Sequence, residues 1–167
     1  QLFEGQYVWV RAYAYPYKYD EAGRPEEVIY ADGSFLELGY DERGNLTQIR
    51  DMAGGVTAYG YDAANRVTET VDANGNVTRY SYDAADRVTA VTDAMGNRRT
   101  YTYNEGGKIE TITDFDGMQA AFTYNPLGKV ETYTDKAGHR AGFAYDRMWN
   151  ISSVTAPDGG IRRYEYD

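Results

Sequence analysis

A regular 21-residue repeat constrains this chain more than any other feature of its sequence. Tyr recurs at that interval eight times, followed each time by Asp or Asn, and a Gly comes fourteen residues after each of the first seven tyrosines. Such self-similarity is typical of repeat architectures, in which one small unit stacks on the next. The repeated residues, which we expect to be structural, are Tyr19, Tyr40, Tyr61, Tyr82, Tyr103, Tyr124, Tyr145 and Tyr166, with Gly33, Gly54, Gly75, Gly96, Gly117, Gly138 and Gly159.

Each repeat has the pattern of an antiparallel β-hairpin. In one unit, residues 67–71 and 77–82 are rich in Thr, Val and Tyr and flank a turn sequence, so they are predicted to form an outgoing and a returning strand. A second aromatic column lies two residues before the first, which places both columns on one face of the returning strand. Its members are Tyr17, Tyr59, Tyr80, Tyr101, Phe122, Phe143 and Tyr164, with Leu38 at the remaining place.

The repeat also divides the chain. Residues 19–167 are interpreted as seven full repeats and the start of an eighth, and residues 1–18 as a degenerate repeat or edge segment, because Ala12 stands where a Gly is expected. About 14 strands would make a sheet roughly 67 Å broad, too wide to remain flat and open. We therefore predict an all-β chain of tandem hairpins that forms a curved, spiralling strip.

Turn residues occur where the hairpins need them. Asp72 and Gly75 provide a side-chain acceptor and a residue that tolerates positive φ. In the turns that link hairpins, Asn65, Asp86 and Trp149 replace Gly. Asn and Asp adopt positive φ readily, whereas Trp does not, so a distorted turn is predicted around Trp149.

The outgoing strands depart from simple alternation. Their apolar residues often fall three apart, as in Leu46 with Ile49 and Ile109 with Ile112. A straight strand would send such residues to opposite faces. Either a β-bulge or a strand that is apolar on both faces would explain the spacing.

The composition of the chain restricts the classes of molecule that it is expected to bind. The net charge of −9, without clustered Lys or Arg, argues against nucleic acid and anionic membranes as ligands. The sequence has no Cys, and no apolar run long enough to cross a bilayer, so no membrane insertion by this segment is expected. Val, Ile, Leu and Phe are scarce, and 18 Tyr supply the apolar surface instead.

No residue constellation indicates catalysis, and neither a cofactor nor a metal is expected. His139 is the sole histidine and follows a turn Gly. Paired carboxylates in catalysis need unlike environments, whereas here one turn position recurs. Calcium is a rival use of these acids, although their loops lack the pattern of an EF-hand or a calcium β-roll. The turn carboxylates in question are Asp51, Asp72, Asp93, Asp114 and Asp135.

The unit formed by residues 61–68, followed by Asp72, Gly75 and Tyr80, resembles the YD repeat of the RHS family. The resemblance covers residues 19–167, with weaker units where Asn104 and Asn125 replace Asp. It implies a strip of hairpins that spirals into a hollow shell, as in bacterial polymorphic toxins, the C component of insecticidal toxin complexes and teneurins. In the bacterial members the shell encloses a C-terminal toxin.

The resemblance implies a non-enzymatic wall segment of a longer protein that is secreted or displayed at the cell surface. Its partners would be the remaining repeats and the enclosed toxin, and uncovered sheet edges would favour self-association. The self-cleavage motif Asp-Pro-x-Gly-Leu of many bacterial members does not occur in the sequence. Two alternatives remain: an extracellular adhesion or glycan-binding module that uses the Tyr columns, and, with less support, an enzyme completed by other parts of the protein.

Overall fold

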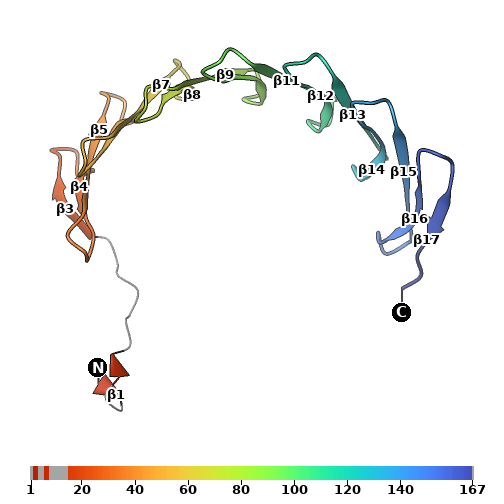
Figure 1. Ribbon diagram of the computed structural model, residues 1–167, viewed down its shortest axis with the longest axis horizontal. Helices are drawn as coiled ribbons and strands as arrows, with labels where there is room; N and C mark the ends of the chain where they lie inside the picture. The colour runs from red at the N-terminus through yellow and green to blue at the C-terminus, as the bar shows by residue number, and fades with distance from the viewer. Residues whose placement is uncertain (1, 4–5, 8–14, 167) are drawn as a thin grey trace. The chain divides into compact units, whose positions relative to one another are not determined.

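The computed structural model describes residues 2–3, 6–7 and 15–166, which form strands and turns without helices (Figure 1). Part of the predicted edge segment, at residues 1, 4–5 and 8–14, lies outside the described residues. Two short strands, β1 (Leu2–Phe3) and β2 (Gln6–Tyr7), pair with each other.

Fifteen strands, β3 to β17, follow one another in the sheet in their sequence order. The predicted strands at 67–71 and 77–82 are confirmed as β8 and β9. The chain divides into two units, residues 1–79 and 80–167, with the boundary inside β9. The strands are β3 (Tyr15–Tyr19), β4 (Pro25–Ile29), β5 (Phe35–Tyr40), β6 (Leu46–Asp51), β7 (Val56–Tyr61), β8 (Val67–Val71), β9 (Val77–Tyr82), β10 (Val88–Thr92), β11 (Arg98–Tyr103), β12 (Ile109–Thr113), β13 (Gln119–Tyr124), β14 (Val130–Thr134), β15 (Arg140–Tyr145), β16 (Ile151–Thr155) and β17 (Ile161–Arg163).

Fourteen five-residue turns connect β3 to β17, and all have the same backbone hydrogen bonds. In the turn at 72–76, the N–H of Gly75 donates to the carbonyl of Asp72 at 2.9 Å, and the N–H of Asp72 donates to the carbonyl of Asn76 at 3.0 Å. This is a type I turn followed by one residue at positive φ, a common connection between antiparallel strands. We call the seven turns after the repeated tyrosines linker turns (20–24, 41–45, 62–66, 83–87, 104–108, 125–129 and 146–150) and the other seven tip turns (30–34, 51–55, 72–76, 93–97, 114–118, 135–139 and 156–160).

The predicted distortion at Trp149 is wrong. Trp149 has φ 68°, close to the 61° of Asn65 and Asp86, and its N–H donates to the carbonyl of Asp146 at 3.1 Å like the other turns. The hydrogen bonds of the turn, including that from Asn150 N–H to Asp146 Oδ1 at 2.9 Å, are intact. The chain therefore keeps the turn geometry and places Trp in a conformation that bulky side chains disfavour.

Of the two explanations for the apolar spacing of three, the β-bulge is confirmed. In the pairing of β11 with β12, Thr102 lies opposite Thr111 while Tyr103 lies opposite Ile109, so Glu110 is the extra residue. Ile112 lies opposite Tyr101, which brings Ile109 and Ile112 to one face. The bulge thus converts a spacing of three into two side chains on the same side of the sheet. Equivalent register shifts occur at Gly39/Tyr40, Gly60/Tyr61, Thr123/Tyr124 and Ala144/Tyr145.

The second unit shows how strongly the two faces differ. Residues directly opposite each other in a sheet share a face, so the register assigns each side chain. One face, the aromatic face, carries Tyr101, Tyr103, Ile109, Ile112, Ala120, Phe122, Tyr124, Val130, Tyr133, Ala141, Phe143, Tyr145, Ile151 and Val154. The other, the threonine face, carries Thr100, Thr102, Thr111, Thr113, Ala121, Thr123, Thr132, Thr134, Gly142, Ala144, Ser153 and Thr155.

The sheet is a single layer. Among the described residues, the buried hydrophobic side chains are Ala90 and Ala120, and no large side chain is fully buried. Most aromatic side chains of the aromatic face are half-exposed. A folded domain ordinarily buries the apolar face of a sheet under a second layer, and the described part of the chain supplies none.

Candidate functional site

The repeated tyrosines connect each hairpin to the one before it. Tyr103 lies opposite the first residue of the next outgoing strand, Ile109. Its hydroxyl donates to the carbonyl of Val88, the first residue of the preceding outgoing strand, at 2.6 Å. For Tyr124 the acceptor is the carbonyl of Ile109, which lies at the bulge of β12, where the ladder of strand hydrogen bonds is interrupted. The same bond, always fifteen residues back, runs from Tyr61 to Leu46, Tyr124 to Ile109, Tyr145 to Val130 and Tyr166 to Ile151.

The Asp after the repeated Tyr closes the linker turn. Asp83 Oδ1 accepts the N–H groups of Ala85 at 2.9 Å and Arg87 at 3.0 Å, while Oδ2 accepts Nε of Arg87 at 2.7 Å. The hydrogen bond from the Arg87 backbone, followed by that from its side chain, lowers the pKa of Asp83 although partial desolvation opposes them. Asp20 and Asp62 make the same contacts with Arg24 and Arg66.

The Arg of one linker turn reaches the Tyr of the next hairpin. The guanidinium of Arg87 lies 4.6 Å from the ring centroid of Tyr103, and Arg24 lies equally close to Tyr40. Cation–π contacts of this kind contribute about 0.5–1 kcal/mol at exposed sites. Where Asn104 replaces Asp, Lys108 stands in place of Arg and lies 5.6 Å from the ring of Tyr124. Asp83, Arg87 and Tyr103 thus form a continuous contact between consecutive hairpins.

The tip turns use the same chemistry at the opposite ends of the strands. Asp72 Oδ1 accepts the N–H groups of Asn74 and Asn76, and Oδ2 accepts the Asn76 amide at 2.8 Å. His139 occupies the equivalent place, with Nδ1 3.0 Å from Asp135 Oδ2. Its side chain is exposed and contacts Asp135 of the same turn, so its geometry is that of a turn residue.

Asp114 differs from the other tip-turn carboxylates, which the repeat alone does not predict. It is 6% exposed and receives both Nε of Arg99 and Nζ of Lys136, so it connects three successive hairpins. In its turn the capping acceptor is Asp116, whose Oδ1 accepts the N–H of Met118 at 3.0 Å. The expectation that the tip-turn acids share one environment is therefore wrong at this position.

The repeated glycines take the fourth position of the tip turns, where φ is positive. Gly75 and Gly96 have φ of 82° and 85°, and open space surrounds the position of a Cβ at both. Conformation, not crowding, therefore favours Gly there. The remaining tip-turn glycines, with φ between 77° and 88°, are Gly33, Gly54, Gly117, Gly138 and Gly159.

The aromatic face of the second unit holds an open groove of about 540 Å³. The rings of Phe122 and Tyr133 lie 5.1 Å apart across neighbouring strands. The hydroxyl of Tyr145 in the same groove is already bonded to the carbonyl of Val130 at 2.8 Å. The groove is thus apolar, lined by Phe122, Val130, Tyr133, Phe143, Tyr145 and Ile151.

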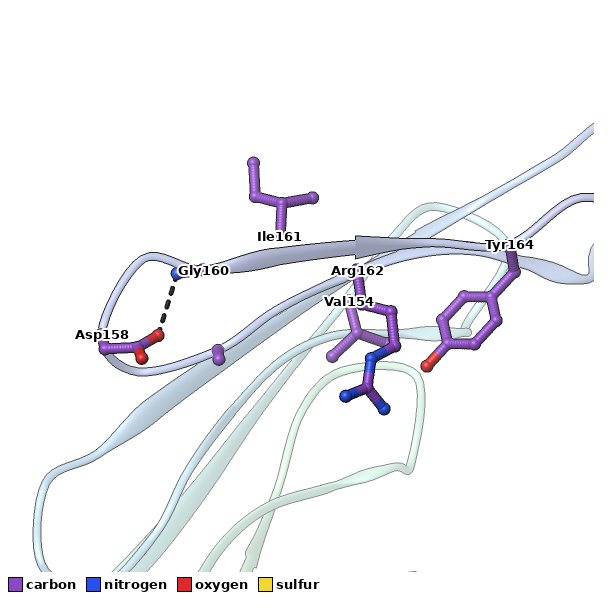
Figure 2. A pocket seen from close by; sticks show the side chains of 7 residues that line it. Val154, Asp158, Gly160, Ile161, Arg162 and Tyr164 are labelled. Atoms are coloured by element: carbon purple, nitrogen blue, oxygen red, sulfur yellow. Dashed lines mark hydrogen bonds between the residues drawn. The ribbon is translucent and has the colours of Figure 1, made fainter.

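The final hairpin changes this face. In Figure 2, Val154, Arg162 and Tyr164 project to one side of β16 and β17, whereas Ile161 projects to the other. Arg162 lies opposite Val154, at the place that Ala120 and Ala141 take in earlier hairpins. Val154, Arg162 and Tyr164 line a hollow of about 450 Å³, so the basic side chain of Arg162 borders it.

Neither a cluster of metal-binding side chains nor a membrane-spanning helix occurs among the described residues. No group of three or more His, Asp or Glu among them lies close enough to hold a metal ion. No helix in the described part of the chain is long and apolar enough to span a membrane. The turn acids instead accept backbone and side-chain hydrogen bonds, as at Asp72 and Asp93.

Comparisons with known proteins agree with the repeat. The family model described as RHS repeat matches residues 40–77, 62–94 and 82–119. A comparison with curated proteins found no significant match.

Several solved structures share the fold. The Tc holotoxin pore of Photorhabdus luminescens matches with a TM-score of 0.69 at 16% identity, over 83% of this chain and 9% of that one. A crystal structure of TcdB2-TccC3-Cdc42 matches with a TM-score of 0.70 at 17% identity, over 88% of this chain. TcdB2-TccC3 without its hypervariable C-terminal region also matches at 0.70 and 17%, over 82%. This chain spans 9% of the length of the last two chains as well. The 21-residue Tyr-Asp hairpins and the family match over residues 40–119 support an RHS/YD-repeat protein, and the solved structures show that its hairpin fold is shared.

Proposed function

We propose that this chain is a wall segment of an RHS-type hollow β-shell that encloses a C-terminal toxin, in a protein that is secreted or displayed at the cell surface. One observation carries the proposal. The sheet is a single layer whose aromatic face has no covering layer in the described part of the chain. A strip of this kind is incomplete by itself, because an apolar sheet face is stable only when something covers it.

The contacts between hairpins suit a wall. The Tyr103 hydroxyl bond and the Arg87–Tyr103 contact recur from one repeat to the next, so each added hairpin brings its own interface. The structural neighbours are chains of Tc toxin complexes, of which this chain spans 9%. Both facts support a segment that contributes to an enclosure without catalysis of its own.

The intact native gene product tests the proposal. Its mass and sequence are expected to show a much longer chain with further repeats in register and a C-terminal module that does not repeat. In that protein, limited proteolysis should leave the C-terminal module protected until the shell is denatured. A native chain that ends near Asp167, or a C-terminal module that is cleaved as fast as an unfolded control, contradicts the proposal.

A glycan-binding module is the second candidate, because the groove at Phe122 and Tyr133 offers aromatic rings to solvent. A sugar also needs polar partners, and the Tyr124 and Tyr145 hydroxyls beside the groove already donate to backbone carbonyls. Glycan-array binding that is lost in Tyr80→Ala and Tyr82→Ala variants, with the fold intact, would favour this candidate. Absence of binding by the wild-type chain removes it.

A further inference from the structure

Trp149 occupies a turn position whose positive φ does not call for a large side chain. The fourth position of the fourteen turns is Gly in eleven, Asn65 and Asp86 in two, and Trp149 in one. A large side chain at φ 68° is disfavoured, and Gly would form the same turn without this cost. Strained residues of this kind often serve a purpose other than folding.

Trp149 belongs to an exposed apolar cluster at the linker-turn edge of the second unit. Trp149 is 46% exposed, Met148 80% and Leu127 62%. Leu127 and Met148 hold the third position of their turns, where the other linker turns have Ala22, Arg43, Ala64, Ala85 and Gly106. Among the linker turns, a large apolar residue at the third position therefore occurs in two consecutive turns. We call Leu127, Met148 and Trp149 of these two turns the Trp149 edge.

The side chains of the Trp149 edge are those that dominate protein interfaces. Trp is the residue type most enriched among binding hot spots, and Met adapts its shape to a partner surface. Exposed apolar clusters rimmed by polar groups commonly mark interaction sites.

The charges of the linker turns indicate the kind of surface that the Trp149 edge contacts. Its two linker turns carry two basic side chains, Lys129 and Arg147, and one acidic side chain, Asp146. The three linker turns of the first unit carry the opposite balance, with three basic and five acidic side chains, among them Glu21 and Glu42, both exposed. The chain therefore has two basic, apolar linker turns in the second unit. It has acidic linker turns in the first unit, where the third position is Ala22, Arg43 or Ala64.

We propose that the Trp149 edge of one copy of this chain docks onto the acidic linker turns of the first unit, residues 20–24, 41–45 and 62–66, of a second copy. In this contact the apolar side chains of the Trp149 edge lie against Ala22 and Ala64 of the acidic linker turns. Lys129 and Arg147 face Glu21 and Glu42. The two surfaces differ, so the contact is heterologous, and it either closes into a ring or continues as a chain of subunits. This inference does not depend on the enclosure of a toxin.

Sedimentation velocity of the full chain over a range of concentrations and salt tests the contact. The wild-type chain is expected to self-associate, more weakly at high salt because charged rims are screened. Trp149→Gly should weaken association by about tenfold or more, as loss of a hot spot does. At a concentration where both chains are monomeric, it should also leave the fold intact and raise the Tm, since it relieves the turn.

Matched variants separate this contact from other modes of association. Met95→Ala removes a side chain that is 85% exposed at a tip turn, and should leave association unchanged. Arg147→Glu and Glu42→Lys should each weaken association, and a mixture of the two single variants should restore it. A monomeric wild-type chain overturns the proposal, as does association that Trp149→Gly leaves unchanged, which would indicate strand-edge pairing. A lowered Tm in Trp149→Gly would show instead that Trp149 stabilises the fold.

Discussion

At the scale of single residues, the tyrosine hydroxyl is the contact that repeats with the least variation. Tyr61, Tyr103, Tyr124, Tyr145 and Tyr166 each donate to a carbonyl fifteen residues back. Desolvation raises the pKa values of Tyr61 and Tyr124 above the ordinary 10.0, which keeps these phenols protonated as donors. The ring and the hydroxyl thus have separate tasks, packing and hydrogen bonding.

Tyr103→Phe should remove the hydroxyl bond to Val88 and keep the ring under Arg87. The free energy of unfolding is expected to fall by about 1 kcal/mol, the usual net contribution of such a bond. Urea denaturation at neutral pH measures the change. Tyr101→Phe is the control, because no hydrogen bond of its hydroxyl is seen among the described residues, and the two variants should differ clearly. Equal losses would contradict the assigned role of the Tyr103 hydroxyl.

The turn carboxylates predict a pH dependence with a definite sign. Backbone hydrogen bonds from Arg66 and Arg87, with help from their side chains, lower the pKa values of Asp62 and Asp83 below 3.8. Their contribution to stability is therefore present above the unfolded pKa and is lost as the pH falls through the lower folded value. An Asn Oδ1 in their place still accepts backbone N–H groups, two at Asn125 and one at Asn104, but titrates at no pH.

The Asp62→Asn/Asp83→Asn double variant should accordingly lose less Tm than the wild-type chain between about pH 5 and pH 2. At neutral pH it should be less stable than the wild-type chain, because the charge-assisted bonds to Arg66 and Arg87 are weakened. Thermal unfolding followed by circular dichroism gives both comparisons. Glu131→Gln removes a carboxylate from an exposed side chain and should leave the pH profile unchanged. An unaltered profile in the double variant would refute the assignment.

At the scale of the element, every hairpin combines two five-residue turns with one bulge. The turns reverse the chain, and the bulge brings residues three apart to one face, as at Ile109 and Ile112. Because the bulge sits at the start of the outgoing strand, it also presents the carbonyl that the next Tyr hydroxyl uses, as at Ile109. One irregularity of the backbone thus determines both the apolar face and the contact between hairpins.

Gly96 and Gly60 separate the conformational role of Gly from its lack of a side chain. At Gly96, φ is 85° and a Cβ would meet nothing within 4 Å, so Gly96→Ala carries only the cost of the left-handed backbone, about 1–2 kcal/mol. At Gly60, within β7, a Cβ would rest 3.5 Å from the Glu69 Cβ in ordinary contact. Gly60→Ala should therefore be neutral or slightly stabilising. Urea titrations that rank the two variants in the other order would contradict this account.

At the scale of the whole molecule, stability arises between neighbouring hairpins and not in a central core. Ala90 and Ala120 are the buried hydrophobic side chains among the described residues, while inter-hairpin contacts recur throughout both units. Repeat proteins of this type are described by the stability of each unit plus its interface with the next. Whole units should therefore be removable, whereas partial units should not.

Deletion of residues 62–82 removes one complete repeat and joins Tyr61 to Asp83, so the Tyr-Asp sequence and the turn that follows are retained. The shortened chain should keep its β-sheet circular dichroism spectrum, with an m-value lower by roughly one-seventh because less surface is exposed on unfolding. Deletion of residues 62–72 removes only half of a repeat and should prevent normal pairing of the strands that follow. A half-repeat deletion as stable as the full-repeat deletion would refute the modular account.

The hairpin period, both sets of turns and the aromatic columns of the returning strands follow from the sequence, because each depends on residues within about one repeat of each other. The choice of a bulge over a strand that is apolar on both faces came from the register of the strands. The tertiary structure alone decided the contacts that cross hairpins, such as Arg87 on Tyr103 and Asp114 between Arg99 and Lys136. Those depend on register and strand spacing, which the pattern of one unit does not specify. It also decided that Trp149 adopts φ 68° in a regular turn, because the hydrogen bonds of the turn and the flanking strands outweigh the preference of a single residue.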